Sequence, residues 1–178
     1  MKIELGGGNK PRGDGYLNLD VLSCADMQHD LRKLPWPLAD ESVESLYSSH
    51  CLEHLDYRTS GDFGLKEVVR EIARVCKVGA DVEIRVPDAA SEMAMCPGHL
   101  AVISINCFRH LDHIFPDQFW KDQPRRLRLI RIEPGPDDYW FPMARKSDLF
   151  SRWTDDEIMT WIPRTRHENR FYLTVEKC

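Results

Sequence analysis

The chain has 178 residues and a formal net charge of −5, and hydrophobic and charged residues make up 42% and 30% of it. This length and balance are typical of one globular domain that buries a full core. No apolar run approaches the ~18 residues of a membrane span, and the acidic balance disfavours a general nucleic-acid binder, which is usually basic. We therefore expect a single domain over residues 1–178 with no membrane partner.

Cysteine usage favours a reducing compartment. The six cysteines include no Cys-x-x-Cys pair and lack the spacing of a disulfide framework. Glycines interrupt the first apolar segment, so we recognise no signal peptide. These features predict a cytoplasmic location.

The first expected elements are two short strands joined by a glycine turn. Apolar and polar residues alternate over residues 2–5, and the run ends at Gly6, Gly7 and Gly8. Glycine permits φ > 0 and lets a ligand lie directly against the main chain. A second strand over residues 16–19 ends at Asp20. This is the layout of a nucleotide-binding α/β unit, in which the acid after the second strand accepts hydrogen bonds from ribose hydroxyls.

The next elements continue the alternation of strands and helices. Residues 43–49 predict a strand, and residues 50–55 follow its carboxyl end, where open parallel sheets bind ligands. Residues 65–75 have helical spacing, and we expect the helix to include Lys77 and to end at Gly79. Its expected apolar face consists of Leu65, Val68, Val69, Ile72 and Val75. The expected polar face consists of Lys66, Glu67, Arg70, Glu71 and Arg74.

The carboxyl-terminal half is less regular. After a strand over residues 81–86, further strands are expected over residues 125–132 and 169–176, with a helix near residues 155–161 capped by Thr154. Together these elements predict an α/β fold with a Rossmann-like, doubly wound, mostly parallel sheet. The last two strands would form an antiparallel pair at its edge. Residues 1–90 would form the cofactor-binding half and residues 91–178 the acceptor-side half.

Several segments between residues 3 and 88 also follow one another in the order and spacing of known motifs. They are Glu4-Leu5-Gly6-Gly7-Gly8 with Asp20, Asp30-Leu31, Leu34-Pro35-Trp36, Ser42-Val43-Glu44, Ser49-His50-Cys51-Leu52-Glu53-His54-Leu55, Glu71-Ile72-Ala73-Arg74-Val75-Cys76-Lys77-Val78-Gly79-Ala80 and Val86-Pro87-Asp88. In these segments the chain resembles the small class I S-adenosylmethionine-dependent methyltransferases.

The resemblance implies a cofactor, S-adenosyl-L-methionine, and the residues that hold it. The glycine turn would pass close to the methionine and ribose parts, and Asp20 would hold the ribose hydroxyls. Asp30 and the backbone of Leu31 would lie at the adenine edge, and the end of the strand over residues 43–49 would border the methionine moiety. The cofactor-binding residues assigned in this way are Glu4, Gly6, Gly7, Gly8, Asp20, Asp30, Leu31, Ser49 and His50.

The chain departs from the family pattern at two points. Lys10 occupies the usual third glycine position, and the stretch between Gly6 and Asp20 is too short for a full crossover helix. We therefore expect the first helix to be shortened or replaced by a loop, which leaves that side of the cofactor pocket more open.

The predicted reaction is methyl transfer to an oxygen or nitrogen atom. The sulfonium already supplies a good leaving group, so the protein must mainly align the acceptor, and a base is needed only where the acceptor loses a proton. The candidate catalytic residues are His50, His54, Asp88 and His99, each of which could instead be a surface or core side chain. The alternative is a non-catalytic binding or scaffold protein that retains the fold.

The acceptor class stays open. The segment after residues 43–49 lacks the Asn-Pro-Pro-Tyr type of motif found in enzymes that methylate amino groups of bases. A small molecule, sugar, nucleotide or peptide is therefore favoured over nucleic acid. Arginines in the second half suggest either a phosphate site or charges that protect an edge strand. They are Arg125, Arg126, Arg128, Arg131, Arg164, Arg166 and Arg170.

Histidines and cysteines are densest over residues 96–113. Cys107, His110 and His113 recur every three residues, and Cys96 and His99 precede them. Zinc takes such ligands, but these spacings match no standard zinc site, and His99 with His110 could equally shape an acceptor pocket. We assign no metal from the sequence.

Overall fold

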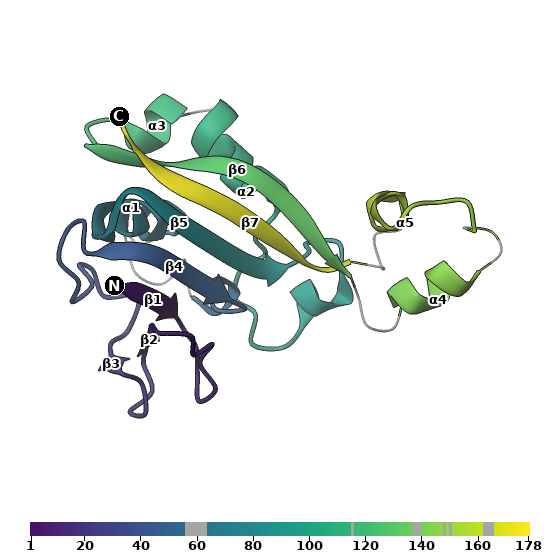
Figure 1. Ribbon diagram of the computed structural model, residues 1–178, viewed down its shortest axis with the longest axis horizontal. Helices are drawn as coiled ribbons and strands as arrows, with labels where there is room; N and C mark the ends of the chain where they lie inside the picture. Colours follow the sequence, from purple (N-terminus) through teal and green to yellow (C-terminus); the bar gives the residue numbers. More distant parts are fainter. Residues whose placement is uncertain (56–63, 115, 137–139, 148, 150, 162–165) are drawn as a thin grey trace.

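The computed structural model describes residues 1–178 except 56–63, 115, 137–139, 148, 150 and 162–165. A seven-stranded sheet, in the order β3-β2-β1-β4-β5-β7-β6, runs through the molecule (Figure 1). Its strands are β1 (Lys2–Leu5), β2 (Tyr16–Asp20), β3 (Met27–Gln28), β4 (Val43–Ser49), β5 (Cys76–Pro87), β6 (Arg125–Pro136) and β7 (Arg166–Lys177). Strands β1 to β5 are mutually parallel, whereas β7 pairs antiparallel with both β5 and β6. The predicted Rossmann-like α/β fold, with a mostly parallel sheet and an antiparallel pair at its edge, is confirmed.

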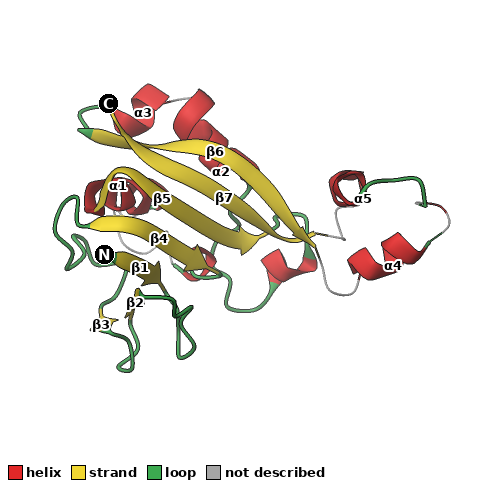
Figure 2. Cartoon of the chain, viewed as in Figure 1, coloured by secondary structure: helices red, strands yellow, loops and turns green. Residues whose placement is uncertain are grey.

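The helices that pack on the sheet lie on one of its faces. Figure 2 shows α1 and α2 behind the strands and α3 next to the edge strand β6, while α4 and α5 lie beyond the ends of β6 and β7. Their bounds are α1 (Leu65–Val75), α2 (Ile105–Arg109), α3 (Pro116–Trp120), α4 (Trp140–Lys146) and α5 (Asp155–Trp161). Shorter helical turns are η1 (Leu52–His54), η2 (Glu92–Met95) and η3 (His110–Ile114).

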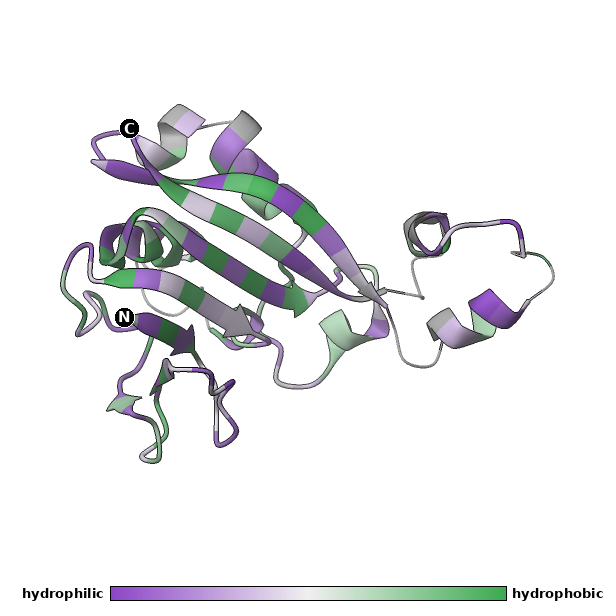
Figure 3. Cartoon of the chain, viewed as in Figure 1, coloured by the Kyte–Doolittle hydropathy of each residue, from purple (hydrophilic) through white to green (hydrophobic). Residues whose placement is uncertain are grey.

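Alternating side chains explain this one-sided packing. Along β5, hydrophobic and hydrophilic residues alternate (Figure 3), and Val82, Ile84 and Val86 are buried. The opposite face of the sheet carries polar and aromatic groups; the guanidinium of Arg12, for example, lies 4.2 Å from the ring centroid of Tyr47. The apolar face therefore forms the core against the helices.

Helix α1 ends earlier than the sequence suggested. We expected it to include Lys77 and to stop at Gly79, but it ends at Val75, and Cys76 is already extended as the first residue of β5. Gly79, with φ +81°, lies inside β5, where the pairing with β4 shifts register. Gly79 therefore allows the irregular backbone at this register shift in β5 and does not end the helix.

A second correction concerns Glu71, which was expected on the polar face of α1. Its side chain is buried, with 7% of the residue exposed, and its Oε1 accepts the backbone N–H of Trp36 at 2.6 Å. The Trp36 indole in turn donates to the carbonyl of Leu31 at 3.0 Å. These bonds hold the segment before β4 against α1 and so fix the position of Asp30 and Leu31.

The remaining expectations concern the first crossover and α5. Residues 6–15 connect β1 to β2 as a loop, so the predicted loss of the first crossover helix is confirmed. At α5, Thr154 Oγ1 accepts the Glu157 N–H, and the Glu157 carboxylate accepts the Thr154 N–H, as in a capping box. All six cysteines are free thiols, and no helix among the described residues could cross a membrane.

Candidate functional site

A cavity of about 350 Å³ opens at the carboxyl ends of β1, β2 and β4. It contains five of the nine predicted cofactor-binding residues, namely Gly6, Asp20, Asp30, Leu31 and His50, together with the candidate base His54. The predicted residues Glu4, Gly7, Gly8 and Ser49 are not part of its lining, nor are Asp88 and His99. The sequence reasoning missed Val21, Arg32, Cys51 and Leu55, which complete it.

Two polar side chains that lie outside the lining, Glu4 and Asn18, hold the glycine loop in place. Glu4 is buried in β1, and its Oε2 accepts the backbone N–H of Arg12 at 2.6 Å. Asn18 accepts the N–H of Gly7 at 2.9 Å and donates to the carbonyl of Gly8 at 3.0 Å. Side chains of β1 and β2 therefore replace the missing crossover helix in holding the loop.

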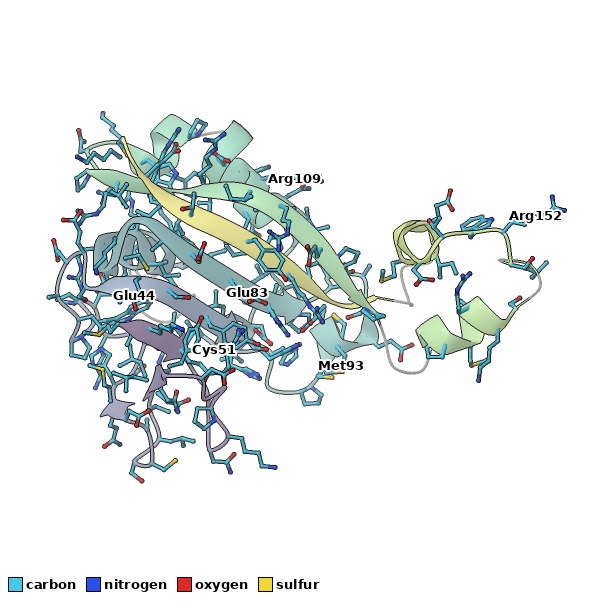
Figure 4. The ribbon with its side chains drawn as sticks, in the orientation of Figure 1. Glu44, Cys51, Glu83, Met93, Arg109 and Arg152 are labelled. Carbon is cyan, nitrogen blue, oxygen red and sulfur yellow. The ribbon has the colours of Figure 1, made fainter. Side chains whose placement is uncertain are left out.

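The two outer glycines of the loop have different surroundings. Both need the left-handed backbone, with φ +67° at Gly6 and +61° at Gly8. A Cβ on Gly6 would lie 2.7 Å from the Cβ of Cys51 and closer still to its Sγ, whereas a Cβ on Gly8 would meet nothing within 4 Å. Figure 4 shows Cys51 at the end of β4, where its side chain occupies the space beside Gly6. Burial raises the pKa of the Cys51 thiol to about 12, so this thiol is a packing group.

Asp20 ends β2 with its carboxylate fixed by backbone amides. Oδ2 accepts the N–H of Gly8 and Oδ1 accepts the N–H of Leu22, each at 2.9 Å, and the residue is 8% exposed. Each carboxylate oxygen has a second lone pair. Asp20 can therefore accept further hydrogen bonds from a ligand in the cavity.

Asp30 is held by the arginine two residues after it. Its carboxylate accepts the Arg32 Nε–H at 2.9 Å and the Arg32 Nη2–H at 3.0 Å. The hydrogen bond from the Arg32 side chain is the main cause of a lowered pKa at Asp30. The rim of the cavity next to Leu31 therefore carries an ionised acceptor.

His50 lies between two carboxylates at the end of β4. Its backbone is left-handed, with φ +49°, an uncommon conformation for a residue other than glycine. The ring Nε2 lies 2.9 Å from Glu168 Oε2, and Nδ1 lies 3.3 Å from Glu53 Oε1. The hydrogen bond with Glu168 and then the contact with Glu53 raise the pKa of His50 to about 9. At neutral pH this favours the imidazolium, which has no lone pair, so the geometry argues against His50 as a general base.

Glu168 connects His50 to two arginines. Its Oε1 accepts the Arg170 Nε–H at 2.6 Å and lies 4.0 Å from Arg85 Nη1. Burial raises the pKa of Glu168, but the hydrogen bonds from His50 and Arg170 outweigh it and lower the pKa to about 2. Both members of the His50–Glu168 pair are therefore charged over a wide pH range.

We expect this pair to make stability depend on pH. Because the pKa of His50 is raised from 6.5 to about 9, His50 contributes stability that is fully present below pH 6.5 and is lost as the pH rises towards 9. Because the pKa of Glu168 is lowered from 4.5 to about 2, Glu168 contributes stability that is present above pH 4.5 and is lost as the pH falls towards 2. Unfolding free energy should therefore be highest between pH 4.5 and 6.5 and decline by about 1–3 kcal/mol up to pH 9. Urea denaturation with EDTA present measures this decline.

Glu168→Gln should flatten the alkaline decline, because the amide carries no charge to stabilise the imidazolium. Glu133→Gln is the matched control, since Glu133 also pairs with an arginine of the sheet, Arg131, which does not titrate in this range. An alkaline decline equally steep in Glu168→Gln and the native protein would contradict the assignment.

The other candidate bases lie in different surroundings. Asp88 is 3% exposed and lies outside the cavity lining; its carboxylate accepts hydrogen bonds from the Asn169 side chain and the Ala90 N–H, both at 2.8 Å. His54 is exposed and lines the cavity, and the centroid of its ring lies 4.7 Å from that of His99. The structure therefore brings His54 and His99 together and keeps Asp88 apart.

The arginines of the second half are largely matched by carboxylates. Arg125 contacts Glu41 at 2.8 Å, and Arg126 forms an ion pair with Glu176 across β6 and β7. Arg164 and the side chain of Arg166 lie outside the described residues. This pairing favours the edge-strand interpretation over a phosphate site.

Comparison with known proteins places the fold. No family model and no curated protein matches the sequence. Solved structures that match include a SAM dependent methyltransferase from Archaeoglobus fulgidus (TM-score 0.57, 13% identity, 98% of this chain and 85% of that one). Another is an S-adenosylmethionine dependent methyltransferase from Mesorhizobium loti (TM-score 0.56, 10% identity, 97% and 89%). A third is geranyl diphosphate C-methyltransferase from Streptomyces coelicolor in complex with Mg²⁺, geranyl diphosphate and S-adenosyl-L-homocysteine (TM-score 0.56, 12% identity, 97% and 72%). The chain therefore has the fold of the class I S-adenosylmethionine-dependent methyltransferases.

Proposed function

We propose that the cavity binds S-adenosylmethionine and that the protein transfers the methyl group to an oxygen or nitrogen atom of a small-molecule, sugar, nucleotide or peptide acceptor. The observation that carries this proposal is the position of two acidic side chains, Asp20 and Asp30, in one cavity at the carboxyl ends of the parallel strands. Open α/β sheets bind ligands at this edge. The shared fold with methyltransferases supports the same function.

The lining matches the chemical groups of this cofactor. The two ribose hydroxyls are donors, and Asp20 retains acceptor capacity on both carboxylate oxygens. The ionised Asp30 would accept from the exocyclic amine of adenine. The cavity volume lies within the range of ligand pockets. Its apolar lining consists of Val21, Leu31 and Leu55.

The protein's own part in the reaction is to position the acceptor and, where needed, to take a proton. The bound cofactor supplies an electrophilic methyl group on a sulfonium. Alignment of the acceptor can contribute about 7–11 kcal/mol in favourable cases. Of the four candidate bases, His54 both lines the cavity and keeps a ring lone pair, because its Nδ1–H donates to the carbonyl of Gly98 at 2.9 Å. We assign the base role to His54 for acceptors that lose a proton.

Calorimetric titration of the purified protein tests the cofactor. We expect S-adenosylmethionine and S-adenosylhomocysteine to bind at one site, and NAD to give no heat, because the glycine loop leads into no helix whose amino terminus could hold a pyrophosphate. Binding of NAD alone, or of none of the three, would contradict the proposal.

One feature favours the second candidate, a binding protein without catalysis. Three of the four candidate bases are either paired with carboxylates, as His50 is, or outside the cavity lining, as Asp88 and His99 are. Such a protein would bind the cofactor but leave the methyl group in place. An acceptor screen with radiolabelled S-adenosylmethionine separates the two, and His54→Ala should then abolish transfer only to acceptors that lose a proton.

A further inference from the structure

Three potential metal ligands converge beside the cavity, and the sequence motifs did not group them. Glu53 and His54 belong to η1, and His99 lies in the loop after η2. One ligand atom of each residue lies within 4.8 Å of those of the other two. Among the side chains that the structure describes, no other histidine, cysteine or carboxylate group comes together in this way. His99 therefore pairs with η1 and not with the described side chains of residues 96–110.

Glu53 is the central observation. The residue is 1% exposed, yet within the described part of the chain neither of its carboxylate oxygens accepts a hydrogen bond. Its Oε1 lies 3.3 Å from His50 Nδ1, and no described residue donates a hydrogen bond to its Oε2. The Nδ1 atom of His99 is likewise buried, with no hydrogen-bond partner among the residues that the structure describes. A buried carboxylate is costly unless it is hydrogen-bonded, paired or bound to a metal. The contact with the His50 imidazolium involves only Oε1, so Oε2 can accept a metal ion.

The tautomer of His54 fits a metal ligand. The Gly98 carbonyl can only accept, so Nδ1 of His54 carries a proton, and in the neutral imidazole the lone pair is then on Nε2. Metal-ligating histidines generally donate their other ring N–H to a carbonyl or carboxylate, which orients the ring and raises its basicity. The hydrogen bond to Gly98 already supplies this second contact.

The backbone holds the two halves of the cluster together. The amides of Leu100 and Ala101 both donate to the Glu53 carbonyl, at 2.8 and 3.0 Å, and the His99 amide donates to the Cys96 carbonyl at 3.1 Å. The loop that carries His99 is thus fixed to η1. Two ligands on one ion, each at about 2.1 Å, are at most about 4.2 Å apart, so small side-chain rotations would close the cluster around an ion.

We propose that Glu53, His54 and His99 bind a divalent transition-metal ion of the zinc class. Two imidazoles and one carboxylate suit zinc, cobalt or nickel, whereas magnesium and calcium prefer oxygen ligands alone. Three protein ligands leave one coordination position open, as in catalytic zinc sites. Because His54 also lines the cavity, that position lies next to the proposed methyl-transfer site. The ion would use the His54 lone pair, so it would replace His54 as the group that activates the acceptor.

Metal titration of the EDTA-treated, thiol-reduced protein tests the site. We expect one equivalent of Zn²⁺ by calorimetry, and His54→Ala and His99→Ala should each weaken it by at least about tenfold, since even loss of an outer partner costs 10–100-fold. Glu53→Gln should do the same while preserving side-chain volume. His29→Ala is the matched control, because His29 also bonds a backbone carbonyl, that of Lys33, through one ring nitrogen.

Cobalt titration excludes binding at the free thiols, since a thiolate ligand adds a sulfur-to-cobalt charge-transfer band that nitrogen and oxygen ligands do not. No binding, equal weakening in His29→Ala, or full affinity in both His54→Ala and His99→Ala would overturn the proposal and leave an edge-to-face histidine pair. The titration contains neither cofactor nor acceptor, so failure of the proposed methyl transfer would leave its result unaffected.

Discussion

Replacing Asp20 with alanine is expected to lower the affinity for S-adenosylmethionine by at least about 100-fold. A hydrogen bond to a charged acceptor contributes about 1.5–3 kcal/mol, and two ribose hydroxyls would lose theirs together. The alanine also frees the amides of Gly8 and Leu22, which would loosen the turn that forms one wall of the cavity. Calorimetric titration measures the affinity, and circular dichroism checks that the fold persists.

Two further variants separate the ligand contact from the support of the turn. Asp20→Asn keeps an acceptor oxygen but loses the charge, so we expect a loss of about tenfold. Asp26→Ala is the matched control: Asp26 accepts the backbone N–H of Asn18 in β2 at 2.8 Å but does not line the cavity. If Asp20→Ala and Asp26→Ala reduced the affinity for S-adenosylmethionine equally, Asp20 would affect binding only by holding the backbone of the turn and not by contacting the ligand.

Local patterns in the sequence predicted the parts of the fold that depend on neighbours along the chain. The alternation over residues 2–5, the short segment with apolar residues over 43–49 and the helical spacing over residues 65–75 correspond to β1, β4 and α1. The glycine turn and Asp20 were found in the same way, because the carboxyl ends of adjacent parallel strands must lie close together. Gly6 and Asp20 in the cavity lining follow from this reasoning, whereas Asp30, Leu31 and His50 were implied by the family resemblance.

Contacts between distant segments could not be predicted from such patterns. Glu168 reaches His50 because the antiparallel register places it opposite Pro87 at the end of β5, beside the end of β4. A glutamate on an expected edge strand gave no signal of this role. The same holds for Glu71. Its position on the helix predicted exposure to solvent, but its carboxylate accepts the backbone N–H of Trp36. Tertiary contacts determine the surroundings of Glu168 and Glu71, and the spacing of residues in the sequence does not reveal such contacts.

Gly6→Ala is expected to destabilise the protein by about 2–5 kcal/mol. The left-handed backbone at Gly6 costs any other residue about 1–2 kcal/mol, and insertion of a methyl group into filled space costs about 1–3 kcal/mol more. The filled space is the side chain of Cys51, which packs where the new Cβ would lie. Urea denaturation measures the loss, and Gly8→Ala, with a similar φ but open space around it, should cost only about 1–2 kcal/mol.

A double-mutant cycle with Cys51→Gly isolates the packing part of this effect. Cys51→Gly removes both the Sγ and the Cβ that the new methyl group would meet, so Gly6→Ala in that background should cost no more than Gly8→Ala does in the native protein. The coupling between the two sites should then be about 1–3 kcal/mol. An equal cost for Gly6→Ala in both backgrounds would show that backbone strain alone requires glycine here. With the predicted coupling, the first glycine of the loop is required by the Cys51 side chain next to the end of β4 as well as by its own left-handed backbone.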